Sequence, residues 1–184
     1  MQKLILYEYL TVDGIAESPE KWQFPYYSQD VAEFNVSRIL TADYLLLGRK
    51  TYDIFAAFWP LQRNNEFGIA DKFNAVPKFV VSSTLRETTW ANTTIIRDAV
   101  QEIGELKRRP GSHIAVPGSI ELARFLIAHG LVDEIHLLVH PIIVGSGKRL
   151  FGSDNRTKPM KLLDSRTFSS GVVFLSYRPD NQGG

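Results

Sequence analysis

The chain has 184 residues, of which 44% are hydrophobic and 22% charged, a composition typical of one globular domain and not of a disordered chain. Its 21 Lys and Arg residues against 20 Asp and Glu residues give a net charge of +1, which argues against a general nucleic-acid binder. The sequence has no Cys, so disulfide scaffolds, thiolate zinc sites, iron–sulfur clusters and Cys nucleophiles are excluded.

The N-terminal segment is apolar only as far as Leu10 and carries Glu8, so we do not expect a secretory signal. No apolar run reaches about 18 residues, the length needed to cross a bilayer. We therefore expect a cytoplasmic protein that does not bind membranes.

The first half of the chain alternates β-rich runs with helical patterns. We expect strands over residues 4–10, 44–47 and 78–81, and helices over residues 30–42 and 51–58. Asp30 with Glu33 resembles a capping pair at the start of the first helix. Residues 64–74 are polar and predict an excursion that contains a helical turn.

The second half continues the alternation. We expect short strands over residues 94–96 and 113–116, and a helix capped by Asp98. A further helix over residues 120–129 is closed by Gly130. The remaining expected elements are the longest β run over residues 134–144, a β-hairpin of residues 160–168 and 172–177, and a frayed tail over residues 179–184.

Helices between strands imply right-handed crossovers and a largely parallel sheet. We therefore expect a single α/β domain over residues 1–178. It would have a mostly parallel central sheet, flanking helices and a C-terminal antiparallel hairpin.

Polar and glycine-rich segments follow three of the expected strands. The first is Gly48-Arg49-Lys50-Thr51, where a glycine permits close backbone approach, the helix start attracts anions, and two cations and a hydroxyl are added. These features suit a phosphate. The alternative is a plain strand–turn–helix junction with two solvated basic residues.

The second segment is Ser82-Ser83-Thr84, whose hydroxyls can donate to phosphate oxygens, although a polar turn or N-cap is the simpler explanation. The third is Pro117-Gly118-Ser119, which leads into a helix and has the pattern that places a pyrophosphate on backbone amides. An ordinary turn capped by Ser119 would give the same pattern. Ligands collect outside the carboxyl ends of strands in such sheets, so the three segments together favour a phosphate-bearing ligand.

The remaining motifs say less about function than these three segments. The segment from Gly145 to Leu150 is neither a dinucleotide fingerprint nor a Walker loop, and a flexible loop or hairpin bend explains it. His136 and His140 on one strand would lie about 13 Å apart, too far to share a metal, so we assign no metal. Asp13-Gly14 after the first strand predicts a turn, or a loop over a bound nicotinamide.

These motifs, in this order, resemble the dihydrofolate reductase-like superfamily. The match rests on T-x-D-G at residues 11–14, L-L-G-R-K-T-Y at mid-chain, V-V-S-S-T-L, V-P-G-S-I-E-L, and above all the block over residues 132–151. The most similar branch is that of the reductase domain of the bacterial bifunctional riboflavin-biosynthesis deaminase-reductase. The resemblance spans residues 3–177.

The resemblance implies an NADPH-dependent reductase, often a homodimer whose late strands form the interface. It places Arg49, Lys50, Ser82 and Ser83, with Thr84 beside them, at the adenosine-side phosphates, including the 2′-phosphate. It places Gly48, Thr51 and the Pro117-Gly118-Ser119 turn at the pyrophosphate. The family's usual Gly-Gly pair appears here as Pro117-Gly118. Asp13 and the segment through Trp22 would cover the nicotinamide.

The natural substrate is open at this stage. A reductase of a small heterocycle similar to 5-amino-6-(5-phosphoribosylamino)uracil is the leading hypothesis, with Trp22 and Asp30 contacting the substrate. Asp30 could instead be only a helix cap. Asp13 is the candidate proton donor, with a bound water as the alternative. Rival functions are a dihydrofolate or pterin reductase and a non-catalytic NADP-binding dimer.

Overall fold

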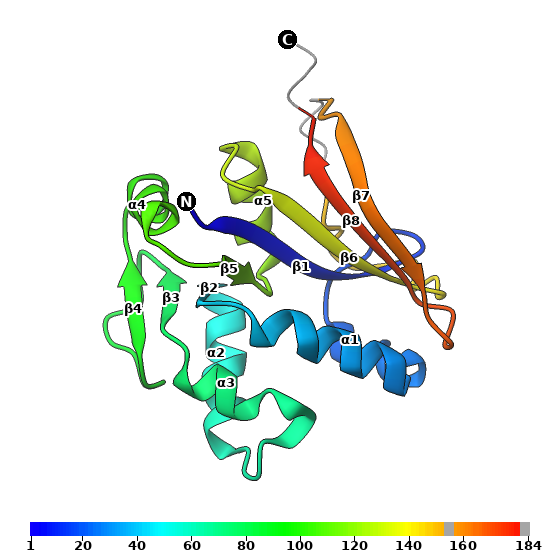
Figure 1. Ribbon diagram of the computed structural model, residues 1–184, viewed down its shortest axis with the longest axis horizontal. Helices are drawn as coiled ribbons and strands as arrows, with labels where there is room; N and C mark the ends of the chain where they lie inside the picture. The colour runs from blue at the N-terminus through cyan, green and yellow to red at the C-terminus, as the bar shows by residue number, and fades with distance from the viewer. Residues whose placement is uncertain (153–156, 181–184) are drawn as a thin grey trace.

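The computed structural model, which describes residues 1–152 and 157–180, contains one eight-stranded sheet with the strand order β4-β3-β2-β5-β1-β6-β8-β7 (Figure 1). Strands β1 to β6 run parallel to one another, and β8 runs antiparallel to both β6 and β7. The strands are β1 (Lys3–Thr11), β2 (Tyr44–Gly48), β3 (Lys78–Val81), β4 (Thr93–Ile96), β5 (His113–Val116), β6 (Glu134–His140), β7 (Met160–Thr167) and β8 (Val173–Pro179).

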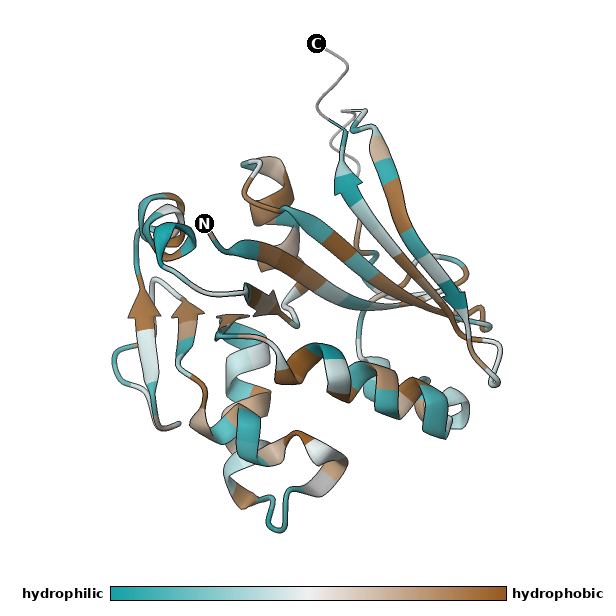
Figure 2. Cartoon of the chain, viewed as in Figure 1, coloured by the Kyte–Doolittle hydropathy of each residue, from teal (hydrophilic) through white to brown (hydrophobic). Residues whose placement is uncertain are grey.

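Helices cover both faces of the sheet. The helices are α1 (Gln29–Leu40), α2 (Arg49–Phe58), α3 (Ala70–Ala75), α4 (Ala99–Arg108) and α5 (Ile120–Ala128). Apolar residues of α4 and α5 pack on one face, and those of α1, α2 and α3 pack on the other. The central strands are therefore covered by apolar side chains on both faces. Figure 2 shows hydrophobic colour along β1 and β5.

Strand β1 divides its side chains between these two layers. Leu4, Leu6 and Leu10 belong to the cluster that contains α4 and α5. Tyr7 and Tyr9 point to the opposite face, toward the layer that contains α1. Glu8 is the one ionisable side chain among the buried residues of β1.

The expected fold class is confirmed: the chain is a single α/β domain with a dihydrofolate reductase-like sheet and a C-terminal antiparallel hairpin. Strands β3 and β5 have the predicted bounds. Asp98 caps α4 by accepting a hydrogen bond from the backbone N–H of Gln101, as expected. Pro179, expected to begin the tail, is the last residue of β8. Residues 181–184 of that tail lie outside the described part of the chain.

Two expectations were wrong. The β run predicted over residues 134–144 ends at His140, because Pro141 has no N–H to continue the ladder, and β1 is longer than β6. Asp30 and Glu33 do not form a capping pair. Ser28 is the N-cap residue of α1, Glu33 accepts from Gln29, and Asp30 accepts from Ser28 and from Ser169 on the β7–β8 turn.

Within the described residues, no helix is both long enough and apolar enough to cross a membrane.

Candidate functional site

Three predicted segments lie along one edge of the sheet. Strands β3, β2 and β5 are neighbours and parallel, so Ser82, Arg49 and Pro117 all follow carboxyl ends at this edge. The Asp13 loop follows β1, the next strand in the order. The structure thus brings Lys50, Ser83 and Ser119 to the same side of the molecule, as the sequence predicted.

The turns after β2 and β5 are in direct contact. The backbone N–H of Gly48 donates to the carbonyl of Gly118 at 3.1 Å. A Cβ on Gly48 would lie 2.2 Å from Oγ of Ser119, and a Cβ on Gly118 would lie 2.9 Å from Oγ1 of Thr51. Gly118 has a φ of 124°, and its peptide bond to Ser119 is cis. Both positions therefore require glycine.

Gly48 and Ser119 are the N-cap residues of α2 and α5. Their contact places two helix N-termini side by side. Each N-terminus presents unpaired amide donors and a partial positive charge, so the pair suits two linked phosphates. Thr51 adds a hydroxyl next to Gly118.

Two cations follow Gly48. The Arg49 guanidinium contacts both carboxylate oxygens of Asp53, at 2.8 and 2.9 Å, one helical turn away. Lys50 Nζ lies 3.8 Å from Oε1 of Glu17, which belongs to the loop after β1. Both cations are exposed. Exposed ion pairs contribute only about 0.2–1 kcal/mol, so both cations can exchange their partner for a phosphate.

The hydroxyls after β3 differ in their availability. Ser82 is buried, and its Oγ accepts from the backbone N–H groups of Thr84 and Leu85. Ser83 and Thr84 are exposed. Sequence reasoning missed Arg97, which follows β4 and donates to the carbonyls of Ser82 and Leu85. This partner is remote in the sequence, and only the pairing of β3 with β4 brings it here.

The loop after β1 is tied to the segment that follows β6. The Asp13 carboxylate accepts from Oγ1 of Thr11 at 2.6 Å and from the backbone N–H groups of Gly145 and Val144 at 2.8 and 3.3 Å. The hydrogen bond from Thr11 and those from the two amides lower the pKa of Asp13 below its usual value. Asp13 is therefore ionised at neutral pH and braces two loops.

The family model of the RibD C-terminal domain matches residues 2–174. The chain belongs to the RibD C-terminal domain family. It is 34% identical over 137 residues to YyaP of Bacillus subtilis (strain 168), an uncharacterised protein, and the match covers 73% of each chain.

Solved structures of other proteins are similar to this chain, among them a pyrimidine reductase-like protein and a dihydrofolate reductase. The pyrimidine reductase-like protein from Corynebacterium diphtheriae superposes with a TM-score of 0.70 at 15% identity, over 98% of this chain and 93% of the other. Dihydrofolate reductase from Enterococcus faecalis, solved with NADP(H), gives a TM-score of 0.65 at 13% identity, over 97% of each chain. At these identities the likeness establishes the fold.

The two predicted substrate residues, Trp22 and Asp30, both make hydrogen bonds within the fold. Trp22 is buried, donates from Nε1 to the carbonyl of Glu17, and packs its ring against His140 at a centroid distance of 5.1 Å. Asp30 accepts from Ser28 and Ser169, and these hydrogen bonds lower its pKa to about 2. The carboxylate of Asp30 is thus already used to hold α1 against the β7–β8 turn.

His140 was given no role from the sequence, yet it is nearly surrounded by aromatic rings. The rings of Tyr9, Trp22 and Tyr26 contact it edge-on. Burial lowers the pKa of His140, so the ring is neutral at pH 7. Its Nδ1 lies 3.0 Å from the carbonyl of Leu138, which assigns the proton to Nδ1 and leaves Nε2 as an acceptor. Only the fold brings these rings together.

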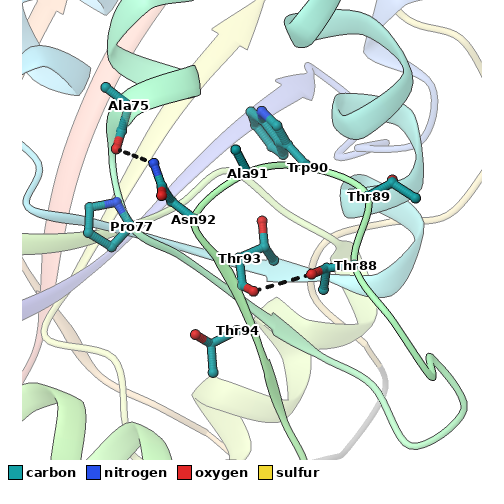
Figure 3. Close-up of a pocket in the computed structure, with 9 residues that line it drawn as sticks. All are labelled: Ala75, Pro77, Thr88, Thr89, Trp90, Ala91, Asn92, Thr93 and Thr94. Atoms are coloured by element: carbon teal, nitrogen blue, oxygen red, sulfur yellow. Dashed lines mark hydrogen bonds between the residues drawn. The ribbon is translucent and has the colours of Figure 1, made fainter.

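A pocket of about 600 Å³ lies at the opposite edge of the sheet (Figure 3). It is formed at the amino ends of β3 and β4 by threonines, Trp90 and Asn92, and no charged side chain lines it. It contains none of the predicted site residues. In the described ranges, 1–152 and 157–180, no group of three or more His, Asp or Glu residues is placed to hold a metal.

Proposed function

We propose that the protein is an NADPH-dependent reductase that reduces a C=N or C=O bond of a small heterocyclic substrate. The observation that carries this proposal is the contact between the N-caps of α2 and α5, Gly48 and Ser119, beside Lys50. Membership of the RibD C-terminal domain family supports it. A substituted pyrimidine similar to 5-amino-6-(5-phosphoribosylamino)uracil is the substrate class that this family name favours.

The residues at the edge fit a dinucleotide phosphate tail. The paired helix N-termini, with Thr51 and the Pro117-Gly118-Ser119 turn, suit the pyrophosphate. Arg49, Lys50, Ser83 and Thr84 would bind the 2′-phosphate, since that group requires donors where an NAD enzyme places an acid. Ser82 would act indirectly, because its hydroxyl already shapes the turn that presents Ser83.

When bound, the nicotinamide would supply a hydride, which is one proton with two electrons, to the electrophilic carbon of the substrate. The chain's own residues bind the cofactor, orient it and exclude water. A proton must also reach the substrate N or O atom. Asp13 as the donor remains a prediction that its lowered pKa opposes, because an ionised carboxylate has no proton to give. We therefore assign that proton to water and propose that Asp13 fixes the loop after β1 to the segment after β6.

The 2′-phosphate assignment is tested by cofactor preference. Arg49→Ala and Ser83→Ala should each weaken NADPH binding far more than NADH binding. Charge-assisted hydrogen bonds to a phosphate contribute about 1.5–3 kcal/mol, so the Arg49 variant should lose roughly 10- to 150-fold in NADPH affinity. Fluorescence titration of each variant with both cofactors measures this. Arg63→Ala, which removes another exposed arginine from the loop before α3, is the matched control. Equal losses for the two cofactors would contradict the assignment.

A non-catalytic NADP-binding protein is the second candidate. It is favoured by the state of Asp13 and Asp30, since both carboxylates are ionised and engaged in hydrogen bonds within the fold. NADPH oxidation with a panel of carbonyl, imine and dihydropterin-type substrates separates the two. Cofactor binding without turnover of any substrate would favour the second candidate.

A further inference from the structure

A second pocket, of about 480 Å³, lies far from the proposed cofactor edge. It is formed between the last turns of α1 and the amino ends of β1, β5 and β6, whereas Gly48 and Ser119 lie at the carboxyl ends. Ile5 and Tyr7 form part of its wall, and Lys3 and Ser37 also line it. Nothing in the proposed reductase chemistry uses this pocket.

Arg38 extends from α1 into the layer between the helix and the sheet. Its guanidinium carbon lies 4.5 Å from the ring centroid of Phe174, 5.0 Å from that of Phe34 and 6.0 Å from that of Tyr7. One amino group, Nη2, lies 2.5 Å from Nδ1 of His136. The Nε of Arg38 is buried without a hydrogen-bond partner. The rings thus fix the guanidinium in place and leave part of its donor capacity unused.

The one carboxylate that lines this pocket, Glu134, already has partners. Glu134 Oε1 accepts from Lys3 Nζ at 2.7 Å, and its Oε2 lies 2.9 Å from Nε2 of His136. Burial and the Arg38 charge lower the pKa of His136 to about 4, so the ring is neutral at pH 7. It lies between Arg38, at Nδ1, and Glu134, at Nε2, with a hydrogen-bond contact to each. Among the described residues, Arg38 makes no ion pair of its own.

The charges around the pocket leave a positive excess. Lys3 and Arg38 face one carboxylate, Glu134. His113, whose Nε2 lies 3.1 Å from the Tyr7 hydroxyl, is neutral because burial lowers its pKa. Asp43 and Lys72 lie near enough to act on His113, with opposite signs, and neither lines the pocket. Because Glu134 is paired with Lys3, the positive charge of Arg38 has no counter-charge among the side chains that line the pocket.

A partly desolvated cation without a counter-charge is costly unless a partner arrives. We propose that this pocket binds a small anion, a carboxylate or a phosphate, with Arg38 as the group that holds it. The planar guanidinium matches either anion, and the apolar surface of Ile5 and Tyr7 accommodates a small organic body. The site does not depend on the proposed reductase activity.

Benzoate and inorganic phosphate are the probes, titrated separately by calorimetry into the purified protein. Arg38→Gln should weaken binding by about 10-fold or more, because the charge-assisted hydrogen bonds are lost. Arg166→Gln is the matched control, since Arg166 also stacks on Phe34, at 5.6 Å, but does not line the pocket. That control should bind both probes as the wild type does.

Two further measurements distinguish this site from the cofactor edge. Phosphate held by the cofactor edge would be lost in Lys50→Gln and kept in Arg38→Gln, and that pattern would overturn the proposal. If Arg38→Gln does not fold, the wild-type protein still gives a result by NMR. On addition of the probes the imidazole resonances of His113 and His136 should shift, and those of exposed His129 should not. Absence of saturable binding of both probes, or binding unchanged in Arg38→Gln, also overturns it.

Discussion

Glu8 places a carboxyl group in the apolar face of β1 that packs under α4 and α5. Its Oε1 is buried without a hydrogen-bond partner, and burial raises the pKa of Glu8 to about 8. The folded protein therefore keeps a proton on Glu8 that the unfolded chain releases near pH 4.5. Since the folded state binds more protons in this window, stability falls as pH rises from about 4.5 to 8.

Glu8→Gln keeps the shape of the side chain and removes its ionisation. We expect the variant to be more stable than the wild type at pH 8, by roughly 4 kcal/mol, and to differ little at pH 4.5. Urea unfolding at both pH values measures the difference. Glu20→Gln, which neutralises an exposed carboxylate, should follow the wild-type profile. A Glu8→Gln variant that is less stable at both pH values would mean that the carboxylate itself contributes to folding.

Helices α2 and α5 meet at their N-termini, and this contact depends on one residue without a side chain. In Gly48→Ala the added carbon would collide with Ser119, 2.2 Å from Oγ and 2.9 Å from the backbone N. The two helix ends would separate, so the variant should lose NADPH affinity by at least about 10-fold and destabilise the fold by about 1–3 kcal/mol.

Fluorescence titration with NADPH and urea unfolding test both effects. Gly104→Ala in α4 is the matched control, because the nearest side-chain atom would be 3.9 Å away and the helix interior favours alanine by about 0.5–1 kcal/mol. It should be slightly more stable and bind NADPH normally. Normal NADPH affinity in Gly48→Ala would show that the paired N-termini do not hold the cofactor.

The sequence predicts well those elements whose structure is determined by residues that are neighbours in the chain. The buried run of β3 and the strand–glycine–helix junctions at Gly48 and Gly118 are visible in the sequence, and parallel topology then places the two junctions at one edge. The end of β6 was missed because the apolar residues after Pro141 look like strand. Without an N–H at Pro141 the ladder stops, and the backbone N–H groups of Val144 and Gly145 bond to Asp13 instead.

The features that the sequence did not predict depend on contacts between residues that are distant in the chain. Asp30 looked like half of a capping pair because Glu33 is local, but one of its two partners, Ser169, lies 139 residues away. Arg97 reaches Ser82 only after β3 and β4 pair. The Arg38 pocket combines one helix with three strands, and no spacing in the sequence relates Arg38 to His136. Local patterns therefore predict the turns, and the tertiary fold decides which carboxylates remain available.

The β7–β8 hairpin projects from the body of the molecule (Figure 1), and Figure 2 shows hydrophobic colour on β7. Every residue of β7 after Met160 is exposed, and Leu162 and Leu163 are 50% and 44% exposed around a β-bulge. β7 is also the last strand of the sheet, so its outer edge can pair with another strand. An edge strand that exposes two adjacent leucines offers a surface for self-association.

We predict that the protein is a homodimer with β7 at the interface. Sedimentation equilibrium at micromolar concentration should give about twice the chain mass of 20.8 kDa. Leu162→Glu should shift the equilibrium to monomer, because a charge would be buried against the partner without compensation. Leu61→Glu makes the same change at a leucine that is 74% exposed outside the hairpin, and should leave the dimer intact. A monomeric wild type, or a dimer that survives Leu162→Glu, would rule out this interface. Because the proposed cofactor turns and the Arg38 pocket do not include β7, the monomeric variant should still bind NADPH.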